Sequence, residues 1–486
     1  MEQLLYRRQF LISEQEEEIA GSFSHCVFNK RHVYCHSDLA CQQVAVGTRS
    51  VMLFGYIIDY RYPMFNDKEL LLKYLEESVD SHGFIKNTFP SGGRWALFYS
   101  DENDSLIFND ATGMRQVYYN SGSKLLIASS EMLLARVLGV QRSARVQSEF
   151  VQQIKHADAT WFPNTATNYD EIKCLIPNTY YHITTRNVSR FWPQQRLNMV
   201  FRDSVNMLHE ILQKTPAALA TRYRDYILGT TSGADSRLTI GYFKNYGTVP
   251  FYIYTIRNSK LSHNSKDIEI PAKLAQHMAM QHLVIEHYEH QDAQFRDIYR
   301  ANNANFKPTY FEMAYNMFCE YPQQYLSVQS VMNEIARQRY AYVPYIPDVH
   351  DVKHFTDYGH LAFAHNEISE WIVGPRRVQK HMNLRVEDLF FMEQRMGRWN
   401  STNRSDWDMI QEVFEPWNNR LIWLIAMSVH PKHKKHVDND IYKALFALSW
   451  PGHNEVEIHR GHEVNYRKYR FRKALSKLKR EILRRG

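Results

Sequence analysis

Small and hydroxyl-bearing residues crowd a six-residue segment near the middle of the chain, residues 231–236, with the sequence TSGADS. The apolar run before it, residues 226–230, has the character of a short buried strand, and residues 238–246 read as a helix. A small-residue loop between a strand and a helix offers converging backbone N–H groups and the positive end of the helix dipole, which favour phosphate. The segment therefore predicts a phosphate-binding loop.

Each residue type in this loop has a physical reason to lie beside phosphate. Glycine allows close approach of the backbone, and the hydroxyl groups are hydrogen-bond donors. Asp235 is the exception, because a carboxylate repels phosphate unless a divalent cation lies between them, so we expect Mg²⁺ bound to pyrophosphate. The candidate nucleotide-binding residues are Thr231, Ser232, Gly233, Asp235, Ser236 and Thr255, the last in the next expected strand.

Two alternatives remain open at the loop. The first is a structural N-cap for a helix that starts near Ser236. The second concerns Arg237, which either adds positive charge for the same anion or faces solvent on the first helical turn.

The elements around the loop alternate in type. A helix is expected at 204–224, strands at 226–230, 251–256 and 283–286, and helices at 238–246 and 267–280. Strands that alternate with helices are typical of a parallel sheet with crossover helices. From residue 295 onward the chain reads as mainly helical.

The first 140 residues have a different pattern, of short apolar runs separated by turn formers. Strands are expected at 51–58, 95–99, 106–109, 117–120 and 125–129, with a helix at 67–78. Such closely spaced strands predict packed antiparallel sheets. Residues 141–193 are looser and read as a connecting segment that ends near Phe191-Trp192-Pro193.

The loop resembles the Ser-Gly-Gly-x-Asp-Ser pyrophosphate loop of the ATP pyrophosphatases, as found in asparagine synthetases. Four further segments resemble that family in the same order: 109–119, 175–193, 267–283 and the EPWNNR element at 415–420, which in the family lines the acceptor site. The resemblance implies an α/β fold class. We expect an N-terminal glutaminase-like (Ntn-type) α+β sandwich at 1–140, a connecting segment at 141–200, and a parallel-sheet ATP-pyrophosphatase synthetase domain with many helices at 201–486.

Two departures from the family pattern shape the expected activity. Glutamine-hydrolysing asparagine synthetases carry a Cys directly after the initiator Met, where this chain has Glu2, so the first domain is expected to be inert, as in β-lactam synthetases, carbapenam synthetases and lasso-peptide cyclases. The late acidic Gly-rich segment has its counterpart at 327–340, which contains no glycine. In that segment Glu334 is the candidate second metal ligand, after Asp235. Arg337 is a candidate catalytic residue that contacts phosphate, and Asp235 is the other candidate catalytic residue. A solvated helix with an ordinary Glu334–Arg337 pair is the alternative.

The resemblance implies an ATP-dependent, AMP-forming amide ligase that uses ATP and Mg²⁺. It would activate a small-molecule, peptide or glycan carboxylate as an acyl-adenylate for attack by an amine, without glutamine hydrolysis. A catalytically degenerate binding subunit is one alternative. An ATP pyrophosphatase that acts on RNA or a nucleotide is another, but it leaves the first 140 residues unexplained, so nucleic acid is not the expected partner.

Bulk properties narrow the remaining classes. The 486 residues suffice for two or three domains. No uninterrupted apolar stretch of about 18 residues is present, so no membrane span is expected. Five cysteines without a paired pattern and a charged N-terminal segment lead us to expect reduced thiols and a cytoplasmic protein.

Two cationic segments invite a functional interpretation. The basic tail 466–486 can recruit an anionic acceptor, although its apolar face through Leu475, Leu478 and Ile482 favours a helix packed on the body. The run 390–399 mixes aromatic residues with Arg395 and Arg398. It can stack against and hold an anionic substrate, and amphipathic helix packing explains it equally well.

Overall fold

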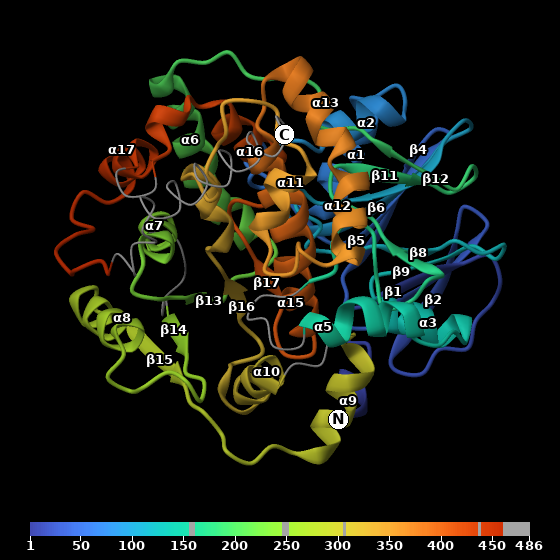
Figure 1. The fold of residues 1–486 in the computed structure, drawn as a ribbon, viewed down its shortest axis with the longest axis horizontal. Helices are drawn as coiled ribbons and strands as arrows, with labels where there is room; N and C mark the ends of the chain where they lie inside the picture. The colour runs from blue at the N-terminus through green and yellow to red at the C-terminus, as the bar shows by residue number, and fades with distance from the viewer. Residues whose placement is uncertain (155–160, 245–251, 305–307, 436–438, 460–486) are drawn as a thin grey trace, which may run out of the picture.

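The computed structural model describes residues 1–154, 161–244, 252–304, 308–435 and 439–459. The basic tail discussed above lies outside these residues. Within them the chain forms two six-stranded antiparallel sheets and one five-stranded parallel sheet, with many helices. Figure 1 shows the antiparallel strands on the right and the parallel strands nearer the centre and left. The predicted α/β class, with a sandwich followed by a parallel sheet, is confirmed.

Both antiparallel sheets are built from the first 190 residues. The strand order of the first is β10 (Ile172–Cys174), β8 (Tyr118–Asn120), β9 (Leu126–Ala128), β1 (Phe10–Ser13), β3 (Arg31–His36) and β2 (Phe23–Phe28). The order of the second is β12 (Asn187–Arg190), β11 (Thr179–His182), β7 (Ser105–Asn109), β6 (Ser91–Ser100), β5 (Arg49–Asp59) and β4 (Cys41–Val46).

The two antiparallel sheets pack face to face through alternate side chains. Phe10 and Ile12 of β1 meet Phe54 of β5 and Phe98 of β6 in one buried cluster, and the rings of Phe10 and Phe54 stack with centroids 4.1 Å apart. Helix α3 (Glu131–Leu138) contacts the first sheet, and α1 (Asp67–Glu76) contacts the second on its outer face. The result is a four-layer helix–sheet–sheet–helix arrangement.

The parallel sheet has the strand order β15 (Gln281–Ile285), β14 (Tyr252–Ile256), β13 (Tyr226–Gly229), β16 (Leu326–Val328) and β17 (Val413–Phe414). The chain proceeds from β13 outward to β15 and then returns to the other side of β13 for β16. The strand order therefore reverses at β13, and in open parallel sheets ligands bind outside the carboxyl ends of the strands at such a reversal.

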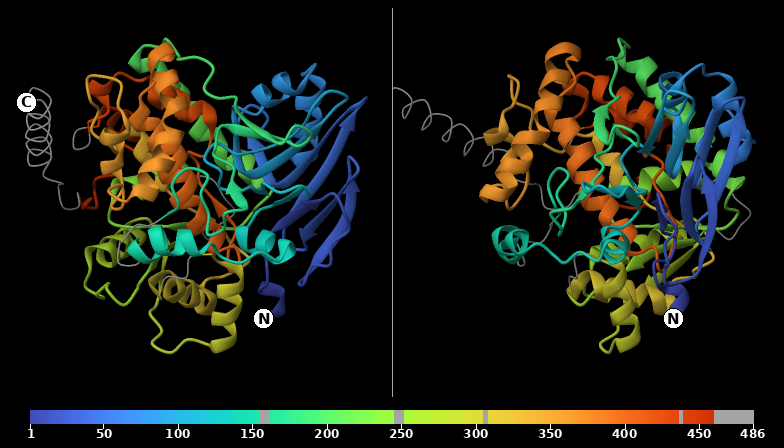
Figure 2. Two further views of the ribbon diagram at one scale, coloured as in Figure 1. Left: turned by 45° about the vertical axis from the view of Figure 1, so that its right-hand side comes forward. Right: turned by 90° about the vertical axis from the view of Figure 1, so that its right-hand side faces the viewer.

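Helices surround the parallel sheet and join it to the sandwich. They are α6 (Phe201–Ala220), α7 (Ala234–Phe243), α8 (Lys266–His277), α9 (Ala293–Asn302), α10 (Pro308–Glu320), α12 (Ala362–Trp371), α13 (Val373–Met382), α14 (Val386–Phe390), a π-helix (Phe391–Asn400), α15 (Ser401–Asp406), α16 (Arg420–Ser428) and α17 (Asp440–Ser449). Shorter helices are α2 (Ser81–Asn87), α4 (Ala144–Val146), α5 (Gln152–Ile154) and α11 (Val349–Val352). Figure 2 shows the sandwich strands gathered on one side and the late helices, in orange and red, on the other.

Most of the expected elements are present, with boundaries shifted by a few residues. The expected helix 267–280 is α8, and the expected strand 251–256 is β14. Strands β16 and β17 were not expected. They have three and two residues, too few to show the alternation of a strand, and they lie in a region that reads as mainly helical. The solvated helix expected as an alternative for 327–340 is present only in part. Ser327 and Val328 belong to β16, and a 3-10 helix spans Val331–Ala336 with most of its residues buried. The Glu334–Arg337 pair of that alternative is formed, at 3.4 Å.

Two further findings concern the expected redox state of the cysteines and the expected absence of a membrane span. Cys35 and Cys41 are joined in a disulfide between β3 and the start of β4, so the expectation that all thiols are reduced is wrong at this pair. Within the described ranges, no helix is both long and apolar enough to cross a membrane.

Candidate functional site

A pocket of about 510 Å³ opens at the carboxyl ends of the parallel strands. Its walls include Gly229 and Thr230 at the end of β13, Thr255 near the end of β14, and Gln329 just after β16. The pocket thus lies at the reversal of strand order, where the fold places ligands. A Cβ at position 229 would lie 2.9 Å from Nε2 of Gln329, so a larger residue there would displace the Gln329 side chain on this wall.

The predicted phosphate loop forms one side of this pocket. Helix α7 begins at Ala234, two residues earlier than the N-cap interpretation required, and no side-chain hydrogen bond caps this end in the described structure. Ser236 lies in the first turn, where its hydroxyl contacts the Thr231 backbone at 3.3 Å. The first N–H groups of α7 and the positive end of its dipole are therefore not covered by a side-chain cap, as an anion site needs.

Asp235 is held at both carboxylate oxygens. The Tyr442 hydroxyl donates to Oδ1 and the Arg337 guanidinium donates to Oδ2. Asn333 Nδ2 also donates to the Asp235 carbonyl oxygen at 3.0 Å. Burial raises the pKa of Asp235 to about 6, although Arg337 lowers it and only partly offsets the burial. The side chain is thus fixed in orientation on the pocket wall.

The two predicted metal ligands lie on the same pocket. Asp235 and Glu334 both line it, and the Arg337 guanidinium lies between them, 3.4 Å from Glu334 Oε1. Arg339 also pairs with Glu334, at 3.2 Å. The described residues contain no group of three or more His, Cys, Asp or Glu that could hold a metal. Two carboxylates still fit Mg²⁺, because this ion commonly takes one or two carboxylates and completes its shell with phosphate oxygens and water.

Ser232 connects the loop to the next helix. Its backbone N–H and its hydroxyl both donate to Asp267 Oδ1 of α8, at 3.0 and 2.5 Å. Ser232 and Gly233 do not line the pocket, whereas five other predicted residues do: Thr231, Asp235, Ser236, Thr255 and Glu334. Asp267 also lines the pocket and was missed by the sequence analysis. An acidic residue in the first turn of the helix that follows the second parallel strand was the available signal.

One expectation about a neighbouring residue needs correction, and a second residue has an additional structural contact. Arg237 faces neither the anion nor solvent: it is buried and donates to the carbonyl oxygens of His453, Val456 and Glu457. Thr255 lines the pocket, but its hydroxyl donates to the Thr230 carbonyl oxygen at 2.9 Å, so it also ties β14 to β13.

The wall opposite the loop is aromatic and cationic. Arg395 and Trp399 of the π-helix line the pocket with Arg404 and Trp407, and the Arg395 guanidinium lies 3.8 Å from the centroid of the Trp399 ring. Arg398 points elsewhere and donates to the carbonyl oxygens of residues 162 and 166. The two interpretations of the run 390–399 therefore apply to different residues. Arg395 faces the pocket, as an anion-binding role needs, and Arg398 packs inside the protein, as helix packing needs.

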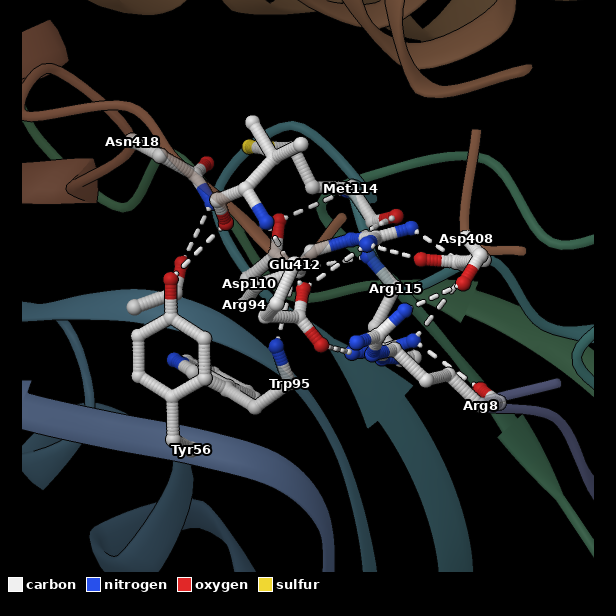
Figure 3. Close-up of polar contacts among 12 residues, drawn as sticks. Arg8, Tyr56, Arg94, Trp95, Asp110, Met114, Arg115, Asp408, Glu412 and Asn418 are labelled. Atoms are coloured by element: carbon white, nitrogen blue, oxygen red, sulfur yellow. Dashed lines mark hydrogen bonds and ion pairs between the residues drawn. The ribbon is translucent and has the colours of Figure 1, made fainter. Parts of the chain in front are cut away.

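A buried network of ion pairs fixes this wall to the sandwich (Figure 3). Arg94 of β6 bonds Asp408 at 2.5 Å and Glu412 at 2.8 Å, and Arg115 bonds Glu412 at 2.8 Å. All four side chains are almost fully buried. Asp408 follows the pocket residue Trp407 directly, so the network holds the segment that carries the aromatic wall.

The EPWNNR element lies at the same boundary and not on the pocket. The Thr112 backbone N–H donates to the Asn418 side chain at 3.0 Å, and Arg420 donates to the Asn109 carbonyl oxygen at 2.7 Å. These two side chains are buried at the boundary with the sandwich and do not line the pocket, so their acceptor-lining role stays a prediction of the resemblance. Glu415 has an indirect connection, because it accepts from the pocket residues Val331 and Arg404.

Comparisons with known proteins give only distant likenesses. No protein-family model matches the chain, and no curated protein matches it in sequence. Among solved structures, glutamine phosphoribosylpyrophosphate amidotransferase from B. subtilis, complexed with ADP and GMP, is 9% identical over 66% of this chain and 92% of that chain, with a TM-score of 0.27.

Two synthetases are similarly remote. NH3-dependent NAD synthetase from Campylobacter jejuni is 11% identical over 41% of this chain and 95% of its own, with a TM-score of 0.22. NMN synthetase from Francisella tularensis is 10% identical over 43% of this chain and 94% of its own, with a TM-score of 0.20. At these identities and TM-scores the likenesses carry no argument about the activity of this chain.

Proposed function

We propose that this protein is an ATP-dependent amide ligase that activates a carboxylate as an acyl-adenylate and joins it to an amine. The observation that carries the proposal is the pocket at the strand reversal, which has the α7 terminus with Asp235 on one side and a cationic aromatic wall on the other. One side suits the pyrophosphate of ATP and the other suits an organic anion.

The residues of the pocket have distinct parts in this reaction. The α7 terminus with Thr231 and Ser236 would bind the departing pyrophosphate, and Arg337 would balance its charge. Asp235 and Glu334 would hold Mg²⁺, which when bound supplies further positive charge to the phosphates. Positioning and preorganised charge would provide most of the rate enhancement, because negative charge develops on phosphate oxygens as the bond breaks.

A binding subunit without turnover is the second candidate function. The observation that favours it is the Arg337 guanidinium between Asp235 and Glu334, in the space where a metal would be shared. In that case the protein would bind a nucleotide and release no pyrophosphate.

Product analysis separates these functions. We expect the purified protein, incubated with ATP, Mg²⁺ and pooled carboxylates and amines, to release AMP and pyrophosphate in equal amounts. Chromatography of the nucleotides and an enzymatic pyrophosphate assay give both yields. Nucleotide binding without AMP would support the binding subunit, and ADP with inorganic phosphate would contradict both proposals.

We expect that glutamine does not serve as nitrogen donor. Glutamine hydrolysis by a thiol requires a thiolate, and the described residues include all five cysteines. Cys35 and Cys41 are disulfide-bonded, and burial raises the pKa of the Cys26, Cys174 and Cys319 thiols. Incubation with glutamine and an assay for glutamate test this. Sustained glutamate release that Cys26→Ala or Cys319→Ala abolishes would contradict the expectation.

A further inference from the structure

A second, smaller cavity of about 160 Å³ adjoins the main pocket. The two cavities share Trp399, Arg404 and Trp407 as walls. The small cavity is completed by residues that do not line the main one, including Tyr310, Asn403 and Asp406. It therefore forms a side pocket that shares the aromatic wall, and no residue of the loop at 231–236 lines it.

Asp406 is the unusual member of this side pocket. It is the last residue of α15 and only 4% exposed, and its Oδ2 has no hydrogen-bond partner among the described residues. No ion pair with a cation is formed by Asp406 in the part of the chain that the structure describes. Burial raises the pKa of Asp406 well above its usual range, and repulsion from Glu131 and Asp408 raises it further. A buried carboxyl without a partner costs folding free energy, so a structural role does not explain it.

Among the described residues that line the side pocket, the positive charge is that of Arg404, and it is already matched. Arg404 lies 3.3 Å from the buried Glu415 carboxylate, and its guanidinium lies 5.6 Å from the Trp407 ring centroid. Glu131 and Asp408 lie close enough to raise the pKa of Asp406, and Asp408 is itself paired with Arg94. The cavity thus combines aromatic walls with an unmatched acidic group, the combination that recognises an organic cation.

We propose that the side pocket is the subsite for the amine reactant, bound as a primary ammonium group with Asp406 as its counter-ion. The proposal deepens the proposed ligase function by assigning one reactant to each side of the aromatic wall. ATP and the carboxylate occupy the main pocket, and the amine enters from the side pocket past Trp399 and Trp407. When ammonium binds, the proton of Asp406 leaves to solvent and the carboxylate pairs with the cation.

Binding of methylammonium to the full chain tests the subsite without knowledge of the natural substrate. We expect saturable one-to-one binding by calorimetry or by ligand-observed NMR. Asp406→Asn keeps the shape of the side chain and removes its charge, so the affinity of the variant for methylammonium should fall by at least tenfold. Asp203→Asn, an exposed position on α6, is the matched control and should bind like the parent. Equal affinity of the parent and Asp406→Asn would overturn the proposal.

A second probe keeps the test decisive if Asp406→Asn does not fold. Methanol has nearly the same size as methylammonium and no charge, so in the parent protein it should not compete for the site. Absence of saturable methylammonium binding, or competition by methanol at similar concentration, would also overturn the proposal. Pyrophosphate release by the same protein, supplied with ATP, Mg²⁺ and pooled carboxylates, tests the ligase function separately. Failure there with methylammonium binding retained refutes the ligase and leaves the cation site.

Discussion

Asp235→Asn should lower ATP-dependent pyrophosphate release by about 100- to 1000-fold, the size of effect seen when one preorganised electrostatic contact to a transition state is lost. The substitution is nearly isosteric and removes the charge expected to hold Mg²⁺. The fold should persist, because an asparagine oxygen can still accept from Arg337 and its amide can donate to the Tyr442 hydroxyl. A pyrophosphate assay across a range of Mg²⁺ concentrations measures the loss.

The same variant has a signature in the stability of the protein. Because the folded pKa of Asp235 is raised from 3.8 to about 6, this group favours the folded state in its protonated form. Its contribution is complete below pH 3.8 and is lost as the pH rises through about 6. Asp235→Asn should therefore flatten the change in unfolding free energy across this window, as followed by denaturant titration at several pH values. The exposed variant Asp203→Asn should retain the parental turnover and pH profile. Parental turnover in Asp235→Asn would mean that the loop is structural only.

Arg94→Met should lower the free energy of unfolding by about 3–5 kcal/mol, the usual cost of removing one partner from a buried ion pair. Among the described residues, Asp408 and Glu412 would then keep Arg115 as their ion-pair partner, at 3.5 and 2.8 Å. Because Asp408 adjoins Trp407, loss of Arg94 should also loosen the aromatic wall and raise the KM for the carboxylate. Denaturant unfolding and steady-state kinetics measure the two effects.

The acid dependence of the same variant provides a second measurement. Burial alone would raise the pKa of Glu412, but Arg115 and Arg94 outweigh it and lower the pKa from 4.5 to about 2. This stabilisation is present above pH 4.5 and is lost as the pH falls toward 2, so Arg94→Met should reduce the loss. Arg145→Met removes exposed ion pairs with Asp170 and Glu149 and should change stability by less than about 1 kcal/mol. Equal effects of Arg94→Met and Arg145→Met would show that the buried network does not stabilise the interface.

Local patterns in the sequence were sufficient for the loop and for much of its support. The apolar run before Thr231, the small residues after it and the alternation of strands with helices each depend on neighbours within a few positions. Such neighbours decide strand and helix formation through periodicity and turn chemistry. The sequence therefore located Thr231, Asp235 and Ser236 on what the structure shows to be one pocket wall.

The partners of those residues were decided only by the tertiary structure. Tyr442 lies 207 positions from Asp235, and Asp408 lies 314 positions from Arg94. Pairs at such separations meet because strand order and sheet packing bring them together, and no local period encodes that meeting. The two-residue strand β17 and the Asp406 Oδ2 atom, which has no hydrogen-bond partner among the described residues, also result from long-range packing. By itself the sequence determined which residue types lie in the loop at 231–236 and predicted that it binds phosphate. Long-range packing decided which charges would face it, which would be buried in ion pairs, and which would be left without a partner.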